Sequence, residues 1–183
     1  MKRVILSLSL IATFVLGVEN NTTATKDVNK SAPKAETQKV LTFNFKAVDG
    51  TEIKVQEMKN GLKYLNFPDK NVILFFYIYD GAPCQKELEI FKKYKEQNKD
   101  VEIIAVELKG LDKDKLLKYS QDKKLNFYNV VGKDAMNFVQ YIAYRAQWQG
   151  TVPFIIITDK NGEVKYINVG LMNKDQLDKV LKK

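Results

Sequence analysis

The sequence predicts an α/β sandwich with a mixed central sheet and helices on its faces. Three observations lead to this fold class. Residues 41–56 have the pattern of a β-hairpin. Two continuous apolar runs, at residues 71–79 and 101–108, are each followed by a charged stretch with helical spacing. A second hairpin pattern and a short helical stretch then follow. A strand–helix–strand unit gives parallel strands, whereas a hairpin gives an antiparallel pair, so one sheet is expected to hold both kinds of pairing.

The first elements are two short strands joined by a tight turn. Apolar and polar residues alternate in LTFNFKAV (41–48) and again in TEIKVQ (51–56). The turn dipeptide Asp49-Gly50 separates the two runs, which is typical of a β-hairpin. The sequence therefore predicts an extra N-terminal β-hairpin ahead of the main sheet.

The next stretch predicts a β-α-β unit. NVILFFYIY (71–79) is apolar throughout, as expected for a central strand that is covered on both faces. Residues 83–98 have helical spacing, and VEIIAVEL (101–108) is a second buried strand.

The remaining elements continue the alternation and end in a hairpin and a helix. In chain order we expect a helix over 112–123, a short strand near 126–130, a helix over 134–145, strands at PFIIITD (153–159) and EVKYINVG (163–170), and a helix over 174–181. Lys160-Asn161-Gly162 is the expected turn between the last two strands.

The residues before the folded region carry the features of an export signal. Lys2 and Arg3 precede an apolar stretch, and Gly17 offers a cleavage point, so residues 1–17 are expected to be a signal peptide. The alternative is an uncleaved membrane anchor, and membrane contact is expected only in that case. Residues 18–39 are polar and predict a disordered linker. Residues 40–183 then form one domain, and the localisation expected is periplasmic or otherwise extracytoplasmic.

Composition excludes several classes of function. The formal charge is +8, but the lysines alternate with acidic residues and Arg145 is the only arginine after residue 3, so nucleic-acid binding is not expected. The chain has no histidine, which removes the usual general base and the commonest metal ligand. It has no glycine-rich phosphate loop, and neither a cofactor nor a metal is expected. The single cysteine, Cys84, excludes an internal disulfide.

Two stretches carry a resemblance to a known family. In FYIYDGAPCQKEL (76–88) an apolar strand leads through a turn with Pro83 and Cys84 into a helix, and in GTVPFIIITDKNGEV (150–164) Pro153 leads a strand. The first stretch resembles the strand, C-x-P-C turn and active-site helix of the thioredoxin superfamily, and within it of the exported TlpA/ResA-like thiol-disulfide oxidoreductases. The second stretch is similar to the one around that family's cis-proline. The resemblance implies a thioredoxin-like three-layer sandwich over residues 40–183.

The resemblance also implies roles for individual residues. Cys84 matches the second, resolving cysteine, and Gly81 stands where the family places its nucleophilic cysteine. Glu87 matches a carboxylate found near the thiols. Pro153 matches the cis-proline, and Val152 matches the residue whose backbone pairs with bound peptide.

Each candidate also has a simpler interpretation. Cys84, Leu88 and Phe91 share one helix face that must pack on the strand at 71–79, which predicts a buried thiol with a raised pKa and low reactivity. The alternative is a reactive monothiol. Glu87 is either a proton shuttle or a solvated carboxylate that the helix dipole favours.

The peptide-binding groove of the fold does not depend on the missing cysteine. Trp148 and Tyr79 are candidates to line it beside Pro153, although aromatic residues of this kind are more often part of the core. Pro153 itself has the simpler interpretation of a proline that leads a strand.

Two functions are compatible with these residues. The first is an accessory, peptide-binding module of exported-protein thiol maturation, whose partners are extended, possibly cysteine-bearing segments. The second is a monothiol redox enzyme that acts through mixed disulfides at Cys84. A peroxidase of the peroxiredoxin type requires a cysteine near position 81 and a threonine or serine upstream, and neither is present.

Overall fold

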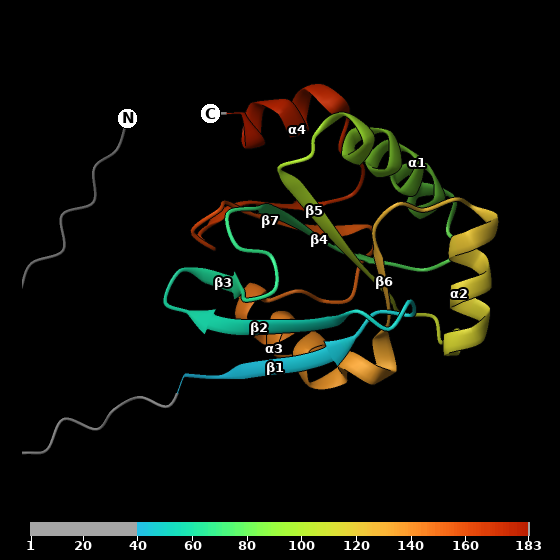
Figure 1. The fold of residues 1–183 in the computed structure, drawn as a ribbon, viewed down its shortest axis with the longest axis horizontal. Coiled ribbons are helices and arrows are strands. Elements are labelled where there is room, and N and C mark those ends of the chain that lie inside the picture. The colour runs from blue at the N-terminus through green and yellow to red at the C-terminus, as the bar shows by residue number, and fades with distance from the viewer. Residues whose placement is uncertain (1–39, 183) are drawn as a thin grey trace, which may run out of the picture. The chain divides into compact units, whose positions relative to one another are not determined.

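A computed structural model describes residues 40–182 of the chain. The predicted signal peptide (1–17) and linker (18–39) lie outside these residues. The described chain contains a three-stranded sheet and a five-stranded sheet, with helices packed on the larger one (Figure 1).

Apart from the additional strand β3 and the 3₁₀ turn η1, the elements follow the order that the sequence predicts. They are β1 (Thr42–Lys46), β2 (Glu52–Met58), β3 (Gly61–Tyr64), β4 (Asn71–Tyr77), α1 (Ala82–Gln97), β5 (Val101–Glu107), α2 (Lys113–Asp122), β6 (Tyr128–Val131), the 3₁₀ helix η1 (Gly132–Ala135), α3 (Met136–Ala146), β7 (Phe154–Thr158), β8 (Val164–Val169) and α4 (Lys174–Leu181). None of the helices in residues 40–182 is long and apolar enough to span a membrane.

The larger sheet is mixed, as predicted, with the strand order β6-β5-β4-β7-β8. β4 pairs in parallel with β5 across the α1 crossover, and β5 pairs in parallel with β6. β7 pairs antiparallel with both β4 and β8. β4 is therefore the central strand, and all seven of its residues are buried.

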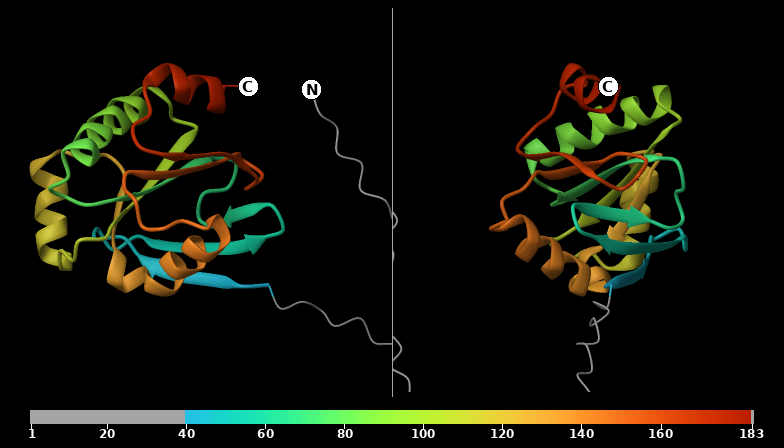
Figure 2. Two further views of the ribbon diagram at one scale, coloured as in Figure 1. Left: turned by 180° about the vertical axis from the view of Figure 1, so that it is seen from behind. Right: turned by 90° about the vertical axis from the view of Figure 1, so that its left-hand side faces the viewer.

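The two faces of the larger sheet carry separate apolar clusters. Phe75 of β4 packs on the side of α1 and α4, in a cluster that contains Phe91 and Leu177. Phe76 points to the other side, where Phe138 of α3 and Leu62 of β3 complete the second cluster. Figures 1 and 2 show α1 and α4 on one side of the sheet and α3 with β1–β3 on the other. The result is the three-layer α/β sandwich that the sequence predicts.

The N-terminal sheet is larger than the predicted hairpin. β1 and β2 form that hairpin, and β3 adds a third antiparallel strand beside β2. The predicted helix over 134–145 also differs, because a 3₁₀ turn at η1 precedes α3.

A close crossing joins the two sheets. Gly61 forms an isolated bridge with Glu163, and Leu62 N donates to Gly162 O at 2.8 Å. A Cβ atom on Gly61 would lie 1.9 Å from Gly162 O, so only glycine fits at this crossing.

Candidate active site

The turn before α1 is built without a polar side chain at the helix start. Gly81 is the N-cap residue, its backbone is extended, and no side chain caps the first turn. Gln85 N donates to Gly81 O at 2.9 Å, which begins the helix. Pro83 lies in the first turn, where its missing N–H removes no intrahelical bond.

Cys84 faces the core, as its spacing from Leu88 and Phe91 predicts. Its side chain is 1% exposed and belongs to the cluster on the α1 side of the sheet. Burial raises the pKa of the Cys84 thiol, and the carboxylates of Glu87 and Asp80 raise it further, whereas a hydrogen bond with the Ile78 backbone lowers it. A raised pKa leaves little thiolate at neutral pH, and the thiolate is the nucleophilic form.

The side chain of Ile78 fills the space beside Gly81. A Cβ atom on Gly81 would lie 2.8 Å from Ile78 Cγ1 and 3.5 Å from Cys84 Sγ. A side chain at position 81 would therefore point toward the Cys84 thiol. The aliphatic side chain of Ile78 occupies the space that a second thiol at this position would need. Sequence reasoning did not single out Ile78, because its packing depends on how the turn folds back.

Glu87 is buried, which corrects the interpretation that it is a solvated carboxylate. It has no exposed surface, and its Oε2 accepts a hydrogen bond from Met172 N at 2.9 Å. Its Oε1 has no hydrogen-bond partner among the described residues. Burial raises the pKa of Glu87 to about 7, although the Met172 hydrogen bond and the charge of Lys86 act in the opposite direction.

An ion pair links the turn before α1 to the loop that follows β5. Asp80 pairs with Lys109, whose ammonium also lies 5.6 Å from the centre of the Tyr79 ring. The buried Glu107 shapes this loop, because its carboxylate accepts hydrogen bonds from three successive backbone amides at 109–111. No local pattern marks the Asp80–Lys109 pair, since its members lie on different loops.

The second predicted stretch forms the loop into β7. The peptide bond between Val152 and Pro153 is cis. Pro153 is buried and its carbonyl accepts a hydrogen bond from Gly170 N at 2.8 Å. Val152 is half-buried and packs against the apolar clusters of both sheet faces. Within residues 40–182, the backbone of Val152 takes part in no backbone hydrogen bond.

The structure does not bring Trp148 and Tyr79 together. The Trp148 ring stacks on Phe154 with centroids 4.7 Å apart, and its Nε1 donates to Thr151 O at 2.7 Å. It therefore packs on the α3 side of the sheet, whereas Tyr79 packs on the α1 side. The two rings do not share a cluster, so the packing gives no support to a single groove lined by both.

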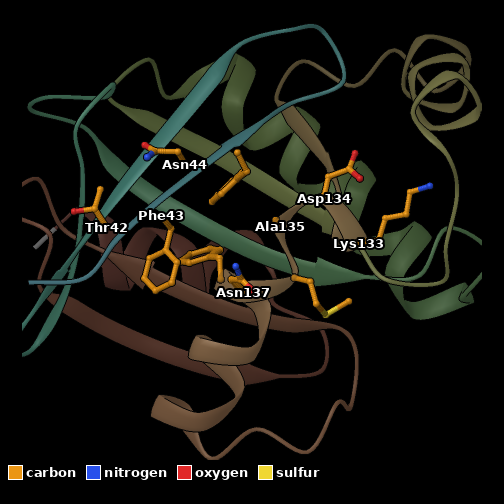
Figure 3. Close-up of a pocket in the computed structure, with 10 residues that line it drawn as sticks. Thr42, Phe43, Asn44, Lys133, Asp134, Ala135 and Asn137 are labelled. Carbon is orange, nitrogen blue, oxygen red and sulfur yellow. The ribbon is translucent and has the colours of Figure 1, made fainter.

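A separate pocket lies between β1 and the start of α3. Figure 3 shows its lining, in which Thr42, Phe43 and Asn44 come from β1, and Lys133, Asp134, Ala135 and Asn137 come from η1 and the start of α3. Its volume is about 220 Å³. This pocket is on the α3 side of the sheet and does not include Cys84. Within residues 40–182, no cluster of three or more Cys, Asp or Glu side chains has the geometry of a metal site.

Comparison with known proteins agrees with this fold. The thiol-disulfide oxidoreductase ResA of Geobacillus kaustophilus (strain HTA426) is 31% identical over 120 residues, which are 63% of this chain and 64% of that relative. The chain thus matches just under two thirds of the relative's length.

Two solved structures share the architecture. StoA from Bacillus subtilis superposes with a TM-score of 0.56 at 21% identity and covers 76% of this chain and 95% of its own. A secreted Mycobacterium tuberculosis disulfide oxidoreductase homologous to E. coli DsbE gives a TM-score of 0.53 at 17% identity, over 75% and 92% of the two chains.

A family model covers most of the described domain. The AhpC/TSA model matches residues 28–167, which include the turn at Gly81–Cys84 and the loop at Val152–Pro153. Together with the ResA match, this agrees with the resemblance that the two sequence stretches carry. The chain belongs to the AhpC/TSA family of the thioredoxin superfamily.

Proposed function

We propose that this protein is an extracytoplasmic, thioredoxin-fold accessory module that binds extended segments of exported proteins during thiol maturation. It runs no dithiol cycle of its own. One observation carries the proposal: the only thiol, Cys84, is 1% exposed and lies beneath Gly81, which has no side chain.

The missing thiol matters because of how disulfide exchange proceeds. An attacking thiolate displaces one sulfur of a substrate disulfide and forms a mixed disulfide. A second thiol of the enzyme then displaces the substrate, so the enzyme supplies two electrons and ends as a disulfide. A chain with Cys84 alone supplies one sulfur and cannot complete this second step.

Peptide binding requires a different surface, for which the loop at Val152–Pro153 is the candidate. The backbone of Val152 is without a backbone partner in the described residues, and Pro153 fixes the adjacent corner of β7. An extended segment that pairs with Val152 gains main-chain hydrogen bonds by strand addition. Such a segment brings its own cysteine, if it has one, toward the turn at Gly81.

The extracytoplasmic location rests on the apolar N-terminal stretch and on the relatives. One solved relative is described as secreted. Exported proteins of this location are the substrates that need thiol maturation.

Thiol titration tests the proposal. The full-length protein is mixed with an excess of 5,5′-dithiobis(2-nitrobenzoic acid) at neutral pH, with and without 6 M guanidinium chloride. We expect one thiol to react rapidly in denaturant and at least about a hundredfold more slowly in the native protein. If the native protein were labelled as fast as the denatured chain, the proposal that Cys84 is buried and unreactive would be overturned.

A monothiol enzyme is the second candidate, and the position of Glu87 favours it. This buried carboxylate is three residues after Cys84 on the same helix, and its pKa of about 7 suits a group that accepts the thiol proton near neutral pH. The Cys84 thiolate would then attack a partner disulfide and release one partner thiolate. An external thiol would displace the mixed disulfide. Mass spectrometry of the protein after incubation with oxidised glutathione distinguishes the two candidates, because only the monothiol enzyme gains one glutathione.

A further inference from the structure

The outer edge of β8 is open and unusually apolar for an edge strand. β8 is the last strand of its sheet and pairs with β7 on one side only. Tyr166, Ile167 and Val169 are 37%, 46% and 57% exposed. Exposed edges are usually protected by charged residues, proline or a bulge on the free side, and Lys165 is the only charged residue in this strand.

The edge of β8 is covered at Val164 and open over the rest of the strand. The tip of the β2–β3 hairpin occupies the start of the strand, where Val164 N donates to Asn60 O at 3.1 Å. No other described strand pairs with this edge beyond that point. Gly170 N donates to Pro153 O, so the alternation of an antiparallel ladder directs the backbone groups of Ile167 and Val169 away from β7.

A groove flanks the open edge on the α4 side of the sheet. It has a volume of about 720 Å³ and reaches β8 at Lys165 and Tyr166. The rest of its lining comes from the ends of neighbouring strands and from one side of α4, namely Asn71, Asp159, Gln176, Lys179, Val180 and Leu181. The groove thus combines an apolar wall with two ammonium groups.

The charge in this groove is positive. Lys179 has no carboxylate within 4.0 Å among residues 40–182. Lys165 lies 3.5 Å from the carboxylate of Asp159, but that carboxylate also accepts hydrogen bonds from the backbone amides of Asn161 and Glu163. An added carboxylate would find Lys179 unpaired and Lys165 only partly neutralised.

The opposite side of β8 is apolar. A hollow of about 160 Å³ lies between β8, α3 and the hairpin tip. Leu62, Ile142, Ile156 and Ile167 form its apolar lining. Its charged members are Lys59 and Arg145, and Arg145 is already paired with Glu57 at 2.9 Å.

We propose that the open edge of β8 is a docking site for an extended segment of another polypeptide in which acidic and apolar side chains alternate. The segment adds as a strand along Lys165–Val169. The register of β8 shifts by one residue between Val164 and Tyr166, so Lys165 and Tyr166 line the groove on the α4 side, whereas Val164 and Ile167 line the hollow on the α3 side. Successive side chains of the added segment point to opposite faces. Its acidic side chains therefore meet Lys165 and Lys179 on the α4 side, while its apolar side chains meet Ile167 and the hollow on the α3 side.

This site is separate from the thiol. The groove includes Asn71, the first residue of β4, whereas the turn that carries Cys84 follows Tyr77, the last residue of that strand. A strand of seven residues is roughly 20 Å long. Docking at β8 therefore requires no reactive Cys84. Val169, at the other end of the docking site, pairs with Phe154 beside the Val152–Pro153 loop. Lys179→Glu lies in the distant groove and leaves that loop unchanged, so it tests docking at β8 separately from binding at Val152.

The test uses a fluorescein-labelled octapeptide of alternating valine and glutamate and the full-length protein, followed by fluorescence anisotropy. We expect saturable binding, and no binding of the matched peptide of alternating valine and lysine. Lys179→Glu should weaken binding about fivefold or more, because it replaces an attraction by a repulsion. Lys93→Glu is the matched control, since Lys93 is an exposed helical lysine outside the groove, and it should bind like the wild type.

The strand-addition geometry has its own variant. Val169→Pro removes an outward N–H without removing a bond to β7, and it should weaken binding about tenfold, whereas Val169→Ala should have a smaller effect. Thermal unfolding of each variant verifies that it is folded. Equal affinity for the two octapeptides, or binding that neither Lys179→Glu nor Val169→Pro changes, would overturn the proposal. So would a dimer in sedimentation velocity that Val169→Pro dissociates, because the edge would then be occupied by a second copy of the chain.

Discussion

The carboxyl group of Glu87 is fully buried and accepts only one hydrogen bond, from Met172 N. An ionised carboxylate in such a place is costly, because one of its oxygen atoms has no donor. The protein lowers the cost by holding the proton, and the pKa of Glu87 is accordingly about 7 rather than 4.5. Protonation of this side chain is therefore linked to folding.

We predict that the protein loses stability as the pH rises from 4.5 to 7. In this range the folded state keeps the Glu87 proton while the unfolded state has released it, so the free energy of unfolding falls with increasing pH. The loss due to Glu87 amounts to about 3 kcal/mol at most, and it is complete once the pH exceeds the folded-state pKa. Urea denaturation at pH 5 and pH 8 measures it.

Glu87→Gln is the control for this pH effect. The amide oxygen still accepts from Met172 N, but the side chain no longer titrates. Subtracting the pH dependence of the variant from that of the wild type cancels all other groups. Parallel curves for the two proteins would show that Glu87 is ionised in the folded state at pH 5.

Gly81→Cys should restore a redox-active pair. The new Cβ would lie 3.5 Å from Cys84 Sγ, so the two sulfurs are close enough to bond after a small adjustment. Ile78 Cγ1 obstructs the site at 2.8 Å, so the double variant Gly81→Cys/Ile78→Ala should form more of the disulfide than the single variant. Insulin reduction in the presence of dithiothreitol reports the activity.

The wild type and Ala82→Cys serve as controls for that assay. Neither should accelerate insulin reduction, because residue 82 lies on the exposed side of the helix while Cys84 is buried. Turnover by the wild type would show instead that Cys84 reacts without a second thiol in the chain.

Helical spacing indicates that Glu87 is buried as well as Cys84. The spacing from Leu88 and Phe91 places Cys84 on the core side. Glu87 lies three residues after Cys84 and four before Phe91, so the same argument places it on the buried face. Charge alone made solvation the simpler expectation. Met172 N, the donor that Oε2 needs, lies 85 residues further along the chain, and no local pattern indicates it.

At the scale of elements, hydrophobic period and turn chemistry predicted nearly every strand and helix. β3 is not among the predicted strands, because the alternation that marks it covers only Leu62, Lys63 and Tyr64 after the turn dipeptide Asn60-Gly61. The pairing of its tip with β8 depends on the tertiary fold. The sequence also does not predict the open edge of β8, because the sequence of a strand does not show whether other strands pair with one or both of its edges.

The start of α4 depends on a reciprocal cap. The Asn173 side chain accepts from Gln176 N, and the Gln176 side chain accepts from Asn173 N, both at 2.9 Å. Asn173→Ala should lower the free energy of unfolding by about 1 kcal/mol, because it leaves a helix amide without its partner. Urea denaturation measures the loss.

Asn173→Ser is the matched control for the cap. A serine oxygen can accept the same amide, so we expect most of the stability to be kept. Equal losses in the alanine and serine variants would mean that the side chain acts through some contact other than the cap.

The molecule as a whole is organised around β4. Apolar clusters cover both of its faces, and strands pair with both of its edges. Opening β4 therefore requires disrupting both cores, whereas the outer edge of β8 is open in the folded state.

Hydrogen exchange should reproduce this gradient. We expect the amides of β4 to exchange only through global unfolding, and those of Ile167 and Val169 to exchange orders of magnitude faster. Mass spectrometry of peptic fragments, or NMR, measures the rates at pH 7. Exchange at Ile167 and Val169 as slow as in β4 would mean that this edge is covered in solution.

The crossing at Gly61 has a consequence for the order in which the chain is made. The hairpin tip is synthesised about a hundred residues before Glu163, the residue that it must meet, so this junction closes only after Glu163 has emerged from the ribosome. A chain that is truncated before Glu163 leaves the β2–β3 hairpin tip without its pairing partner and β7 without its neighbour β8. Such a truncated chain exposes a free strand edge and an unpaired hairpin tip, which are segments that proteases cleave readily.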